Sequence, residues 1–347
     1  MFKSLKTVVL LAAVTLFCGR ALGGNELRLY IWSEYIDPAI VKAFEQKFNC
    51  KVFVDLYESN EEMTAKLLAG GVSQYDIVVP SGYAVKSMIK QNLLLKLDKN
   101  KIPNLKNIDA KFNHLPSDPN GEFSVPYQWG TVGIYYRKDK VKNFQPSWSM
   151  VLSDQARGSF ILMDSTREMI GSVLIALGKS PNTTDKQDII AAAKAILAAK
   201  GNKDFKGFEG GIGGKNQVIA GTAAMAVTYN GDAVRGMADN PNTAFVNPIE
   251  GGLIWVDSMG ITAQAPNVEL AHEFINFILD PRIGAQLSNF NRYPTPNAAA
   301  LPFIKPEDLK NAAIYPSDAT KSKLQFLDDL GLGNRTYDEA WTMIKSR

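Results

Sequence analysis

Acidic and aromatic residues occur in short motifs where predicted strands end. The motifs are Trp32-Ser-Glu-Tyr35, Ser81-Gly-Tyr83, Asp164-Ser-Thr-Arg-Glu168, Tyr229-Asn-Gly-Asp232 and Trp255-Val-Asp257. If these strand ends converge on one cleft, carboxylates and aromatic faces line it together. Carboxylates pair with ammonium groups, while aromatic rings attract cations and pack against methylene chains. The motifs therefore predict a site for a ligand that carries two or more ammonium groups on an apolar chain.

Each motif also has a structural interpretation that needs no ligand. Ser165 and Glu168 have the spacing of a capping box at a helix N-terminus. Asn230-Gly231 is typical of a turn, and Asp232 is placed to cap the helix that follows. The tryptophans of the first and last motifs have the usual chemistry of core residues. The choice between these interpretations depends on whether the strand ends meet in space.

The chain has few residues for metal, redox or histidine-based chemistry. His114 and His272 are its two histidines, and Cys50 is its one cysteine beyond residue 23. These residues make neither a zinc-binding pattern nor an intrachain disulfide, so no metal or cofactor is expected. A Ser-His-Asp triad would have to recruit one isolated histidine. We therefore expect both histidines to be structural and Cys50 to be a small buried apolar residue.

The formal charge of the chain is concentrated at its N-terminus. The sequence has 347 residues and a formal charge of +3 at pH 7. Lys3, Lys6 and Arg20 lie within the first 23 residues, which contain no acidic residue. The remaining sequence has 35 basic and 35 acidic residues, so its charge gives no reason to expect a nucleic-acid partner.

The same N-terminal residues have the pattern of an export signal. Two lysines precede an apolar core at 8–17, and Ala21-Leu22-Gly23 places small residues where signal peptidase cleaves. The apolar core has about half the length of a membrane-spanning helix, so we expect 1–23 to be a signal peptide. Cys18 offers a second route, lipid attachment after cleavage just before it, although Phe17 is larger than lipoprotein signals usually have there.

Hydrophobic periodicity predicts an α/β fold. Predicted strands cover residues 27–32, 51–56, 75–80, 131–136, 160–163, 223–228 and 252–256. Predicted helices cover residues 38–48, 61–68, 83–90, 167–177 and 184–200. This alternation indicates a mostly parallel sheet that binds ligands beyond the carboxyl ends of its strands, and the length suggests about two domains.

The glycine-rich segment at 210–214 does not complete a phosphate-binding motif. Lys215 follows it, but Asn216 stands where such a motif needs serine or threonine. We predict a flexible loop in this segment.

Seven motifs, in one order along the chain, resemble those of the bacterial spermidine/putrescine-binding periplasmic proteins of ABC transporters. They are Trp32-Ser-Glu-Tyr35, Tyr57-Glu-Ser-Asn-Glu61, Tyr75-Asp-Ile-Val-Val-Pro-Ser81, Pro126-Tyr-Gln-Trp-Gly130, Tyr229-Asn-Gly-Asp232, Trp255-Val-Asp-Ser258 and Tyr293-Pro-Thr-Pro-Asn297. The resemblance runs from about Leu27 to the C-terminus. It implies a two-lobed periplasmic-binding-protein (clamshell) fold of the α/β class. Each lobe is a mostly parallel sheet flanked by helices, and crossing strands join the lobes.

The resemblance also implies how the chain is divided and what it does. Strands near 131–134 and 255–257 would cross between the lobes. Lobe one would comprise 24–131 plus 257–295, and lobe two 132–256 plus 296–347. Such a protein is a non-catalytic periplasmic receptor that works as a monomer. It closes around a polyamine and delivers it to an inner-membrane ABC permease.

By match to the ligand positions of this family, twelve residues would form the site. The aromatic box would be Trp32, Tyr35, Tyr83, Tyr229, Trp255 and Tyr293, with hydrogen bonds from Ser33, Glu34 and Ser81, and with Glu168, Asp232 and Asp257 as amine partners. Asp257 is the first choice among these acids, because it lies on a crossing strand and has no capping role.

Departures from the family pattern bear on the choice of polyamine. Ser165 stands where spermidine-preferring relatives tend to have aspartate, Tyr229 replaces their usual tryptophan, and Leu327 replaces a polar residue. Asp232 instead resembles the putrescine-preferring relatives. We therefore expect both putrescine and spermidine to bind.

Two alternative functions remain open at this point. The first keeps the receptor fold but changes the ligand to another small cation, a metal chelate, thiamine or an amino acid. A bound anion would need a basic site, whereas the strand-end motifs are acidic apart from Arg167. The second is a secreted hydrolase in which Glu168 and Asp257 act as acid and base.

Overall fold

The computed structural model of the chain describes residues 25–153 and 158–346. Its strands are β1 (Glu26–Trp32), β2 (Lys51–Tyr57), β3 (Ile77–Val78), β4 (Ser124–Arg137), β5 (Phe160–Met163), β6 (Phe205–Glu209), β7 (Met225–Tyr229), β8 (Thr243–Val246), β9 (Gly252–Ile261) and β10 (Leu324–Gln325). In the described residues they form one sheet in the order β2-β1-β3-β9-β4-β7-β5-β6, with β8 paired to β4 and β10 to β9. β1 pairs in parallel with β2 and β3, and β5 with β6 and β7, so both outer parts of the sheet are parallel.

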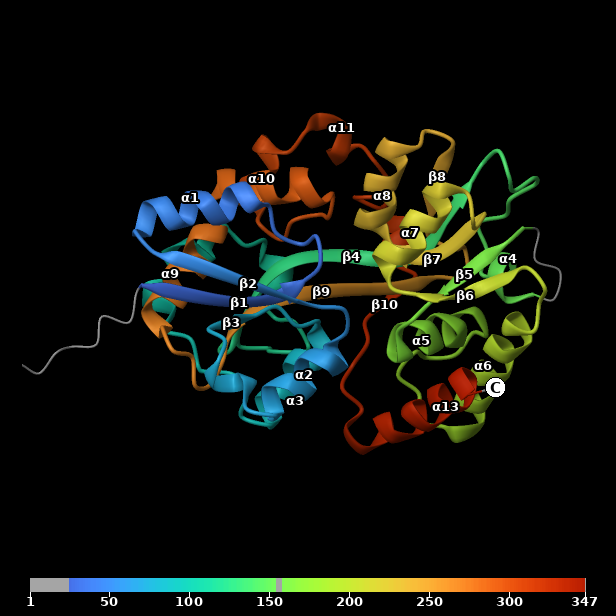
Figure 1. Cartoon of the computed structure of the whole chain (residues 1–347), viewed down its shortest axis with the longest axis horizontal. Helices are drawn as coiled ribbons and strands as arrows, with labels where there is room; N and C mark the ends of the chain where they lie inside the picture. The colour runs from blue at the N-terminus through green and yellow to red at the C-terminus, as the bar shows by residue number, and fades with distance from the viewer. Residues whose placement is uncertain (1–24, 154–157, 347) are drawn as a thin grey trace, which may run out of the picture.

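The long strands β4 and β9 cross the middle of the molecule as an antiparallel pair (Figure 1). β9 pairs with β3 near Ile261, and β4 pairs with β7 near Val132. The two strands therefore belong to both halves of the sheet, which is the arrangement that the family resemblance implies. Residues in the middle of β9, such as Trp255, lie between the halves.

Helices cover both faces of each half of the sheet (Figure 1). Beside the half that contains β1 lie α1 (Pro38–Phe48), α9 (Val268–Ile278) and α10 (Pro281–Asn291) on one face and α2 (Asn60–Leu68) and α3 (Gly82–Lys90) on the other. Beside the half that contains β5 lie α7 (Gly211–Ala220) and α8 (Asn230–Asp239) on one face and α5 (Thr166–Ala176), α6 (Lys186–Lys200) and α13 (Asn334–Ser346) on the other. The short helices are α4 (Ser149–Leu152), α11 (Pro306–Leu309) and α12 (Asp318–Lys321).

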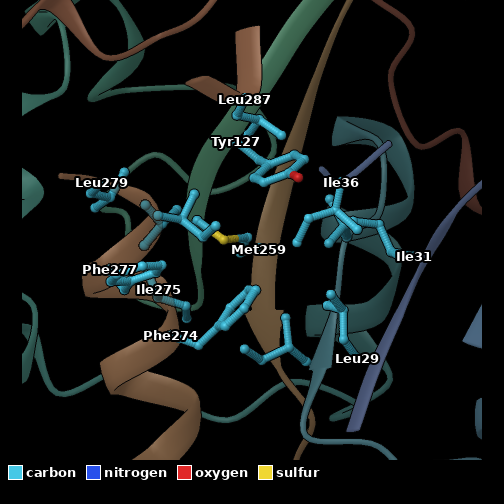
Figure 2. Close-up of a cluster of buried hydrophobic side chains, with 14 of the residues drawn as sticks. Leu29, Ile31, Ile36, Tyr127, Met259, Phe274, Ile275, Phe277, Leu279 and Leu287 are labelled. Carbon is cyan, nitrogen blue, oxygen red and sulfur yellow. The ribbon is translucent and has the colours of Figure 1, made fainter. Parts of the chain in front are cut away.

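Each half of the sheet packs its own apolar core. In the first core, Leu29 of β1 lies with Met259 of β9 and Phe274 of α9 (Figure 2). The second core packs β5 and β7 against α5, α6 and α13. The two cores adjoin along β4, where Trp129 belongs to the first and Val132 to the second. The crossing strands are therefore shared by both cores.

The predicted strands and helices occur with ends that differ by at most seven residues, but the glycine-rich segment was predicted wrongly. Residues 210–214 are not a loop, because α7 begins at Gly211. Gly214 and Val218 are buried on this helix. Tertiary packing thus outweighs the low helix propensity of glycine.

Two of the structural interpretations that needed no ligand are also wrong. The Ser165 hydroxyl donates to the Glu168 carboxylate, and its side chain caps no backbone N–H of α5. Asn230-Gly231 is not a turn, since it opens α8, and Asp232 lies in the first turn of that helix and not at its cap. Neither Glu168 nor Asp232 is therefore used as a helix cap.

Both histidines have structural environments. His272 is buried on α9, where its Nδ1 donates to the Val268 carbonyl (2.8 Å) and its Nε2 accepts from the Asp98 backbone N–H (3.0 Å). His114 is exposed and hydrogen bonds to a backbone carbonyl at 2.9 Å. Cys50 is half-buried against the first core, which is less buried than predicted. The described residues contain no group of three His, Cys, Asp or Glu side chains arranged to hold a metal ion.

The predicted signal peptide at 1–23, with Cys18 inside it, lies outside the described residues. Among the helices that the structure does describe, none combines the length and the apolar character of a membrane span. Export and lipid attachment therefore stay predictions.

Candidate functional site

A cavity lies at the carboxyl ends of β1, β3, β5 and β7, beside the middle of β9. Eleven of the twelve predicted site residues line it: Trp32, Ser33, Tyr35, Ser81, Tyr83, Glu168, Tyr229, Asp232, Trp255, Asp257 and Tyr293. Glu34 lies instead in an adjoining hollow, with its backbone in the left-handed region at φ 52°. The strand ends thus meet in space. The contact of these residues with a ligand stays a prediction.

Four aromatic rings form a continuous wall of the cavity. Tyr229 meets Trp255 edge-on at 5.8 Å between ring centroids, Trp255 meets Tyr293 at 5.1 Å, and Tyr293 meets Tyr35 at 5.4 Å. Trp32 is held separately, because its indole N–H donates to a backbone carbonyl at 2.9 Å. Edge-to-face contacts hold each ring in one orientation, so the wall presents fixed π surfaces to the cavity.

Two glycines make room for this wall. A Cβ atom at Gly231 would lie 2.5 Å from the Tyr293 ring. A Cβ atom at Gly211 would lie 2.6 Å from the Tyr229 ring and 2.7 Å from Asp232 Oδ2. These distances are far below van der Waals contact, so a larger residue at either position would displace the wall. The absence of a side chain at Gly211 therefore leaves room for Tyr229 and Asp232 beside the cavity.

Three acidic residues, Glu61, Glu168 and Asp257, form what we call the acidic group. Burial raises the pKa of Glu168 to about 8, and the Glu61 and Asp257 carboxylates add to the rise, while the Tyr229 hydroxyl and Arg167 oppose it. Glu61 is exposed, unlike the other two acids, but the protein around it still removes enough water to raise its pKa. Within the described residues, no lysine or arginine forms a salt bridge with any of the three. The acidic group therefore has no salt-bridge partner in the described residues, and Arg167 compensates its charge only in part.

Asp257 lies on β9, opposite Ser81 in an isolated bridge. Burial raises its pKa to about 7, and the hydroxyls of Ser81 and Tyr35 only partly offset the rise. The Tyr35 hydroxyl lies close enough to lower the pKa of Asp257, but this hydroxyl, Asp257 Oδ1 and Trp255 Nε1 are all buried without a partner at hydrogen-bond distance and angle in the part of the chain that the structure describes. Such atoms are unusual and costly inside proteins. Three of them around one cavity favour a site that binds a polar ligand.

A second set of charges, which we call the paired group, consists of Glu34, Lys215, Asp232 and Arg235. Arg235 lies 2.7 Å from Asp232 and 2.9 Å from Glu34, and Lys215 lies 3.2 Å from Glu34. Burial would raise the pKa of Glu34, but Lys215 and Arg235 outweigh it and lower this pKa. For Asp232, burial outweighs Arg235 and Lys215 and raises the pKa. Two acids and two bases balance in this group.

The residues that complete the two groups were not predicted from the sequence. Glu61 ends a motif that follows β2, so the strand-end argument applied to it as well. Lys215 and Arg235 lie inside helices, 181 and 201 residues from Glu34, and no local pattern links them. The other cavity residues that were not predicted are Glu58, Ser59, Asn60, Met163, Asp164, Ser165, Gly210, Gly211 and Ile212.

Two sheet halves joined by crossing strands, with a cavity between them, define a two-lobed binding protein. The chain belongs to the bacterial extracellular solute-binding protein family, whose pattern it matches over residues 39–317. It is 34% identical over 342 residues to the "Spermidine/putrescine-binding periplasmic protein" of Escherichia coli (strain K12), and the match covers 97% of each chain. It is also 34% identical over 357 residues to the "Putrescine/cadaverine-binding protein" of Pseudomonas aeruginosa, covering 99% of this chain and 100% of that protein.

A solved structure shows the same fold. The chain resembles a "Putative spermidine/putrescine ABC transporter from Listeria monocytogenes" with a TM-score of 0.86 and 33% identity, covering 92% of this chain and 99% of that one. The comparisons confirm the predicted family and fold class. Since the curated relatives are named as binding proteins, they also argue against the hydrolase alternative.

Proposed function

We propose that the chain is a periplasmic solute-binding protein of an ABC transporter and that its ligand is a polyamine. The observation that carries this proposal is the acidic group, three carboxylates without a basic partner in the described residues, beside a wall of aromatic rings. A methylene chain with ammonium groups complements both features. The names of both curated relatives include putrescine, which supports the same class of ligand.

Asp257 and Glu168 are the proposed amine partners, with Glu61 beside Glu168. The aromatic wall, together with Trp32 and Tyr83, would pack against the methylene groups. Ser33 and Ser81 would add hydrogen bonds, although the Ser33 hydroxyl already donates to a neighbouring glutamate. Asp232 and Glu34 complete the predicted set. Their carboxylates, however, already form salt bridges with Arg235.

We further propose that the two halves of the sheet act as lobes, divided as 24–131 plus 257–295 and 132–256 plus 296–347. A ligand that contacts both lobes stabilises their closed arrangement, which a permease can then distinguish from the open one. The protein would act as a monomer and deliver its ligand to an inner-membrane permease. Residues 1–23 would direct its export, with lipid attachment at Cys18 as the second route.

Titration calorimetry with putrescine, spermidine and spermine tests the proposed ligand class. We expect stoichiometric binding of putrescine and spermidine. 1-Butylamine, which has the carbon chain of putrescine but one ammonium group, should bind far more weakly. The absence of both heat and thermal stabilisation with every polyamine would overturn the proposal.

Two further measurements separate the alternatives. Titrations with thiamine and with amino acids should give no binding if the site is built for polyamines. Incubation with a panel of glycosides should give no turnover. Turnover that depends on Glu168 and Asp257 would instead support the hydrolase.

A further inference from the structure

We infer that Arg235 makes the site select diamines over longer polyamines, because its guanidinium already occupies the place of an ammonium group at Asp232. This inference rests on the proposed function. Arg235 NH2 lies 2.7 Å from Asp232 Oδ1 and 2.9 Å from Glu34 Oε2, and its NH1 donates to the Asn291 carbonyl at 2.9 Å. The Arg235 side chain is only 16% exposed. The guanidinium is therefore held behind Asp232 by three acceptors.

A ligand ammonium group brought to Asp232 would meet this guanidinium on the same carboxylate. Like charges a few ångströms apart repel strongly where water is largely excluded. Lys215 adds a second positive charge, 3.2 Å from Glu34. Because its two acids are balanced by two bases, the paired group offers no net attraction to another cation.

The cavity also extends in another direction, which is equally unsuited to a third ammonium group. A smaller hollow adjoins it at Glu168 and continues past Phe326 and Leu327, which are apolar. The acid that lines this hollow further out, Asp328, already binds Lys86 at 2.7 Å. A triamine that extends toward Asp232 or toward Phe326 would therefore place one charge against the guanidinium of the paired group or against an apolar wall. A diamine can keep both of its charges at the acidic group.

Arg235 has a second effect that the experiment must separate from selection. It links the two halves of the molecule, since Glu34 follows β1 whereas Arg235 lies on α8. Loss of this link would disfavour the closed arrangement and weaken the binding of every polyamine alike. Loss of charge-based selection would change the ratio of the affinities instead. The ratio of the Kd values for putrescine and spermidine therefore separates the two effects.

The test variant is Arg235→Met, which removes the charge and keeps a long side chain. We expect the affinity for spermidine to rise relative to that for putrescine by about tenfold or more, because Asp232 becomes available to the third ammonium group. Arg235→Lys keeps the positive charge and should keep the wild-type ratio. The double variant D232N/R235M removes both charges and should return the ratio toward that of the wild type.

Glu34→Gln provides the control for the link between the halves. It removes a charged contact of Arg235 but leaves Arg235 on Asp232, so the binding of both polyamines should weaken and spermidine should gain no affinity relative to putrescine. Circular dichroism and thermal unfolding establish that each variant is folded. If Arg235→Met is unfolded, Arg235→Gln gives the same test with a side chain that can still donate hydrogen bonds.

The outcomes distinguish this inference from the proposed function. An unchanged ratio in the folded, uncharged variant, with both polyamines still bound, would overturn the inference and leave the proposed function intact. Failure of the wild type to bind either polyamine would overturn the proposed function itself.

Discussion

The acidic group and the paired group show two environments of carboxylates in and beside one cavity. Glu168 and Asp257 are buried without a basic partner, and their pKa values rise to about 8 and about 7. Glu34 is held by Lys215 and Arg235, which lower its pKa. Desolvation opposes the charged form in both groups, but only the paired group is compensated within the chain. The number of acids that line a cavity therefore does not give its attraction for cations, which depends on the charge left unpaired.

Among the variants that test this comparison, Asp257→Asn has the largest expected effect on the Kd for putrescine. The amide keeps the shape of the side chain but loses the charge that pairs with a desolvated ammonium group, so the Kd for putrescine should rise by more than about tenfold. Titration calorimetry measures the change. Asp318→Asn removes an exposed acid on α12 and should leave the Kd unchanged. An unchanged Kd for Asp257→Asn would remove Asp257 from the proposed amine partners.

Affinity for putrescine should fall as the pH is lowered from 8 to 5. An ammonium group binds ionised carboxylates, and Glu168 and Asp257, with pKa values of about 8 and about 7, become protonated over this range. Each such carboxyl lowers the affinity about tenfold per pH unit below its pKa. Glu34 should contribute nothing, because its pKa is lowered.

Binding near pH 7 should also release protons from the acidic group. Calorimetry in buffers with different heats of ionisation counts these protons. If no proton is released, the acidic group is already ionised before the ligand binds. Such a result would contradict the difference in pKa between the two groups.

The ligand-free protein should unfold at a lower temperature at pH 8 than at pH 6. The pKa values of Glu168 and Asp257 in the folded protein lie above their unfolded values of 4.5 and 3.8. The folded state thus holds more protons than the unfolded state over the window between, and stability falls as the pH rises through it.

A substitution in the acidic group and one in the paired group should change the melting temperature in opposite directions. Glu168→Gln should raise the melting temperature at pH 8 by a few degrees and flatten its pH dependence. Arg235→Met should lower the melting temperature, because it leaves Asp232 and Glu34 without their guanidinium. Thermal unfolding followed by circular dichroism measures both. A change of the same sign in the two variants would contradict the comparison.

Gly211→Ala has the smallest expected effect on binding. The added Cβ would press on Tyr229 and Asp232, at 2.6 and 2.7 Å, and leave the acidic group largely in place. About 1 kcal/mol of strain corresponds to binding about fivefold weaker. Gly201→Ala is the matched control, since its Cβ would meet no atom closer than 3.5 Å. A loss as large as that of Asp257→Asn would mean that the paired group matters as much as the acidic group.

The parts of the fold that were predicted correctly are determined by residues close together in the sequence. Pro38 suits the first turn of α1, and the apolar run at 160–163 coincides with β5, because periodicity and proline geometry act within a few residues. Convergence of the strand ends was also predictable, since the carboxyl ends of parallel strands share one edge. The start of α7 was not, because Gly211 begins a helix that is stabilised by packing against distant residues.

The place of Glu34 could not be predicted from the motif that contains it. Its neighbours Ser33 and Tyr35 line the cavity, whereas the left-handed backbone at Glu34 accompanies a side chain paired with Lys215 and Arg235. The sequence near Glu34 contains neither base. The division of charge between the two groups therefore follows from tertiary structure alone.

The return of the chain to the first half of the sheet has a consequence for the order of folding. The core that begins with Leu27 also needs Met259 and Phe274, so it cannot close before residue 274 has been made. Contacts between residues so far apart in sequence form slowly. A chain exported from its N-terminus, as proposed here, would therefore be translocated before its first core is able to form. The strands that join the two halves also delay the folding of the half that is synthesised first.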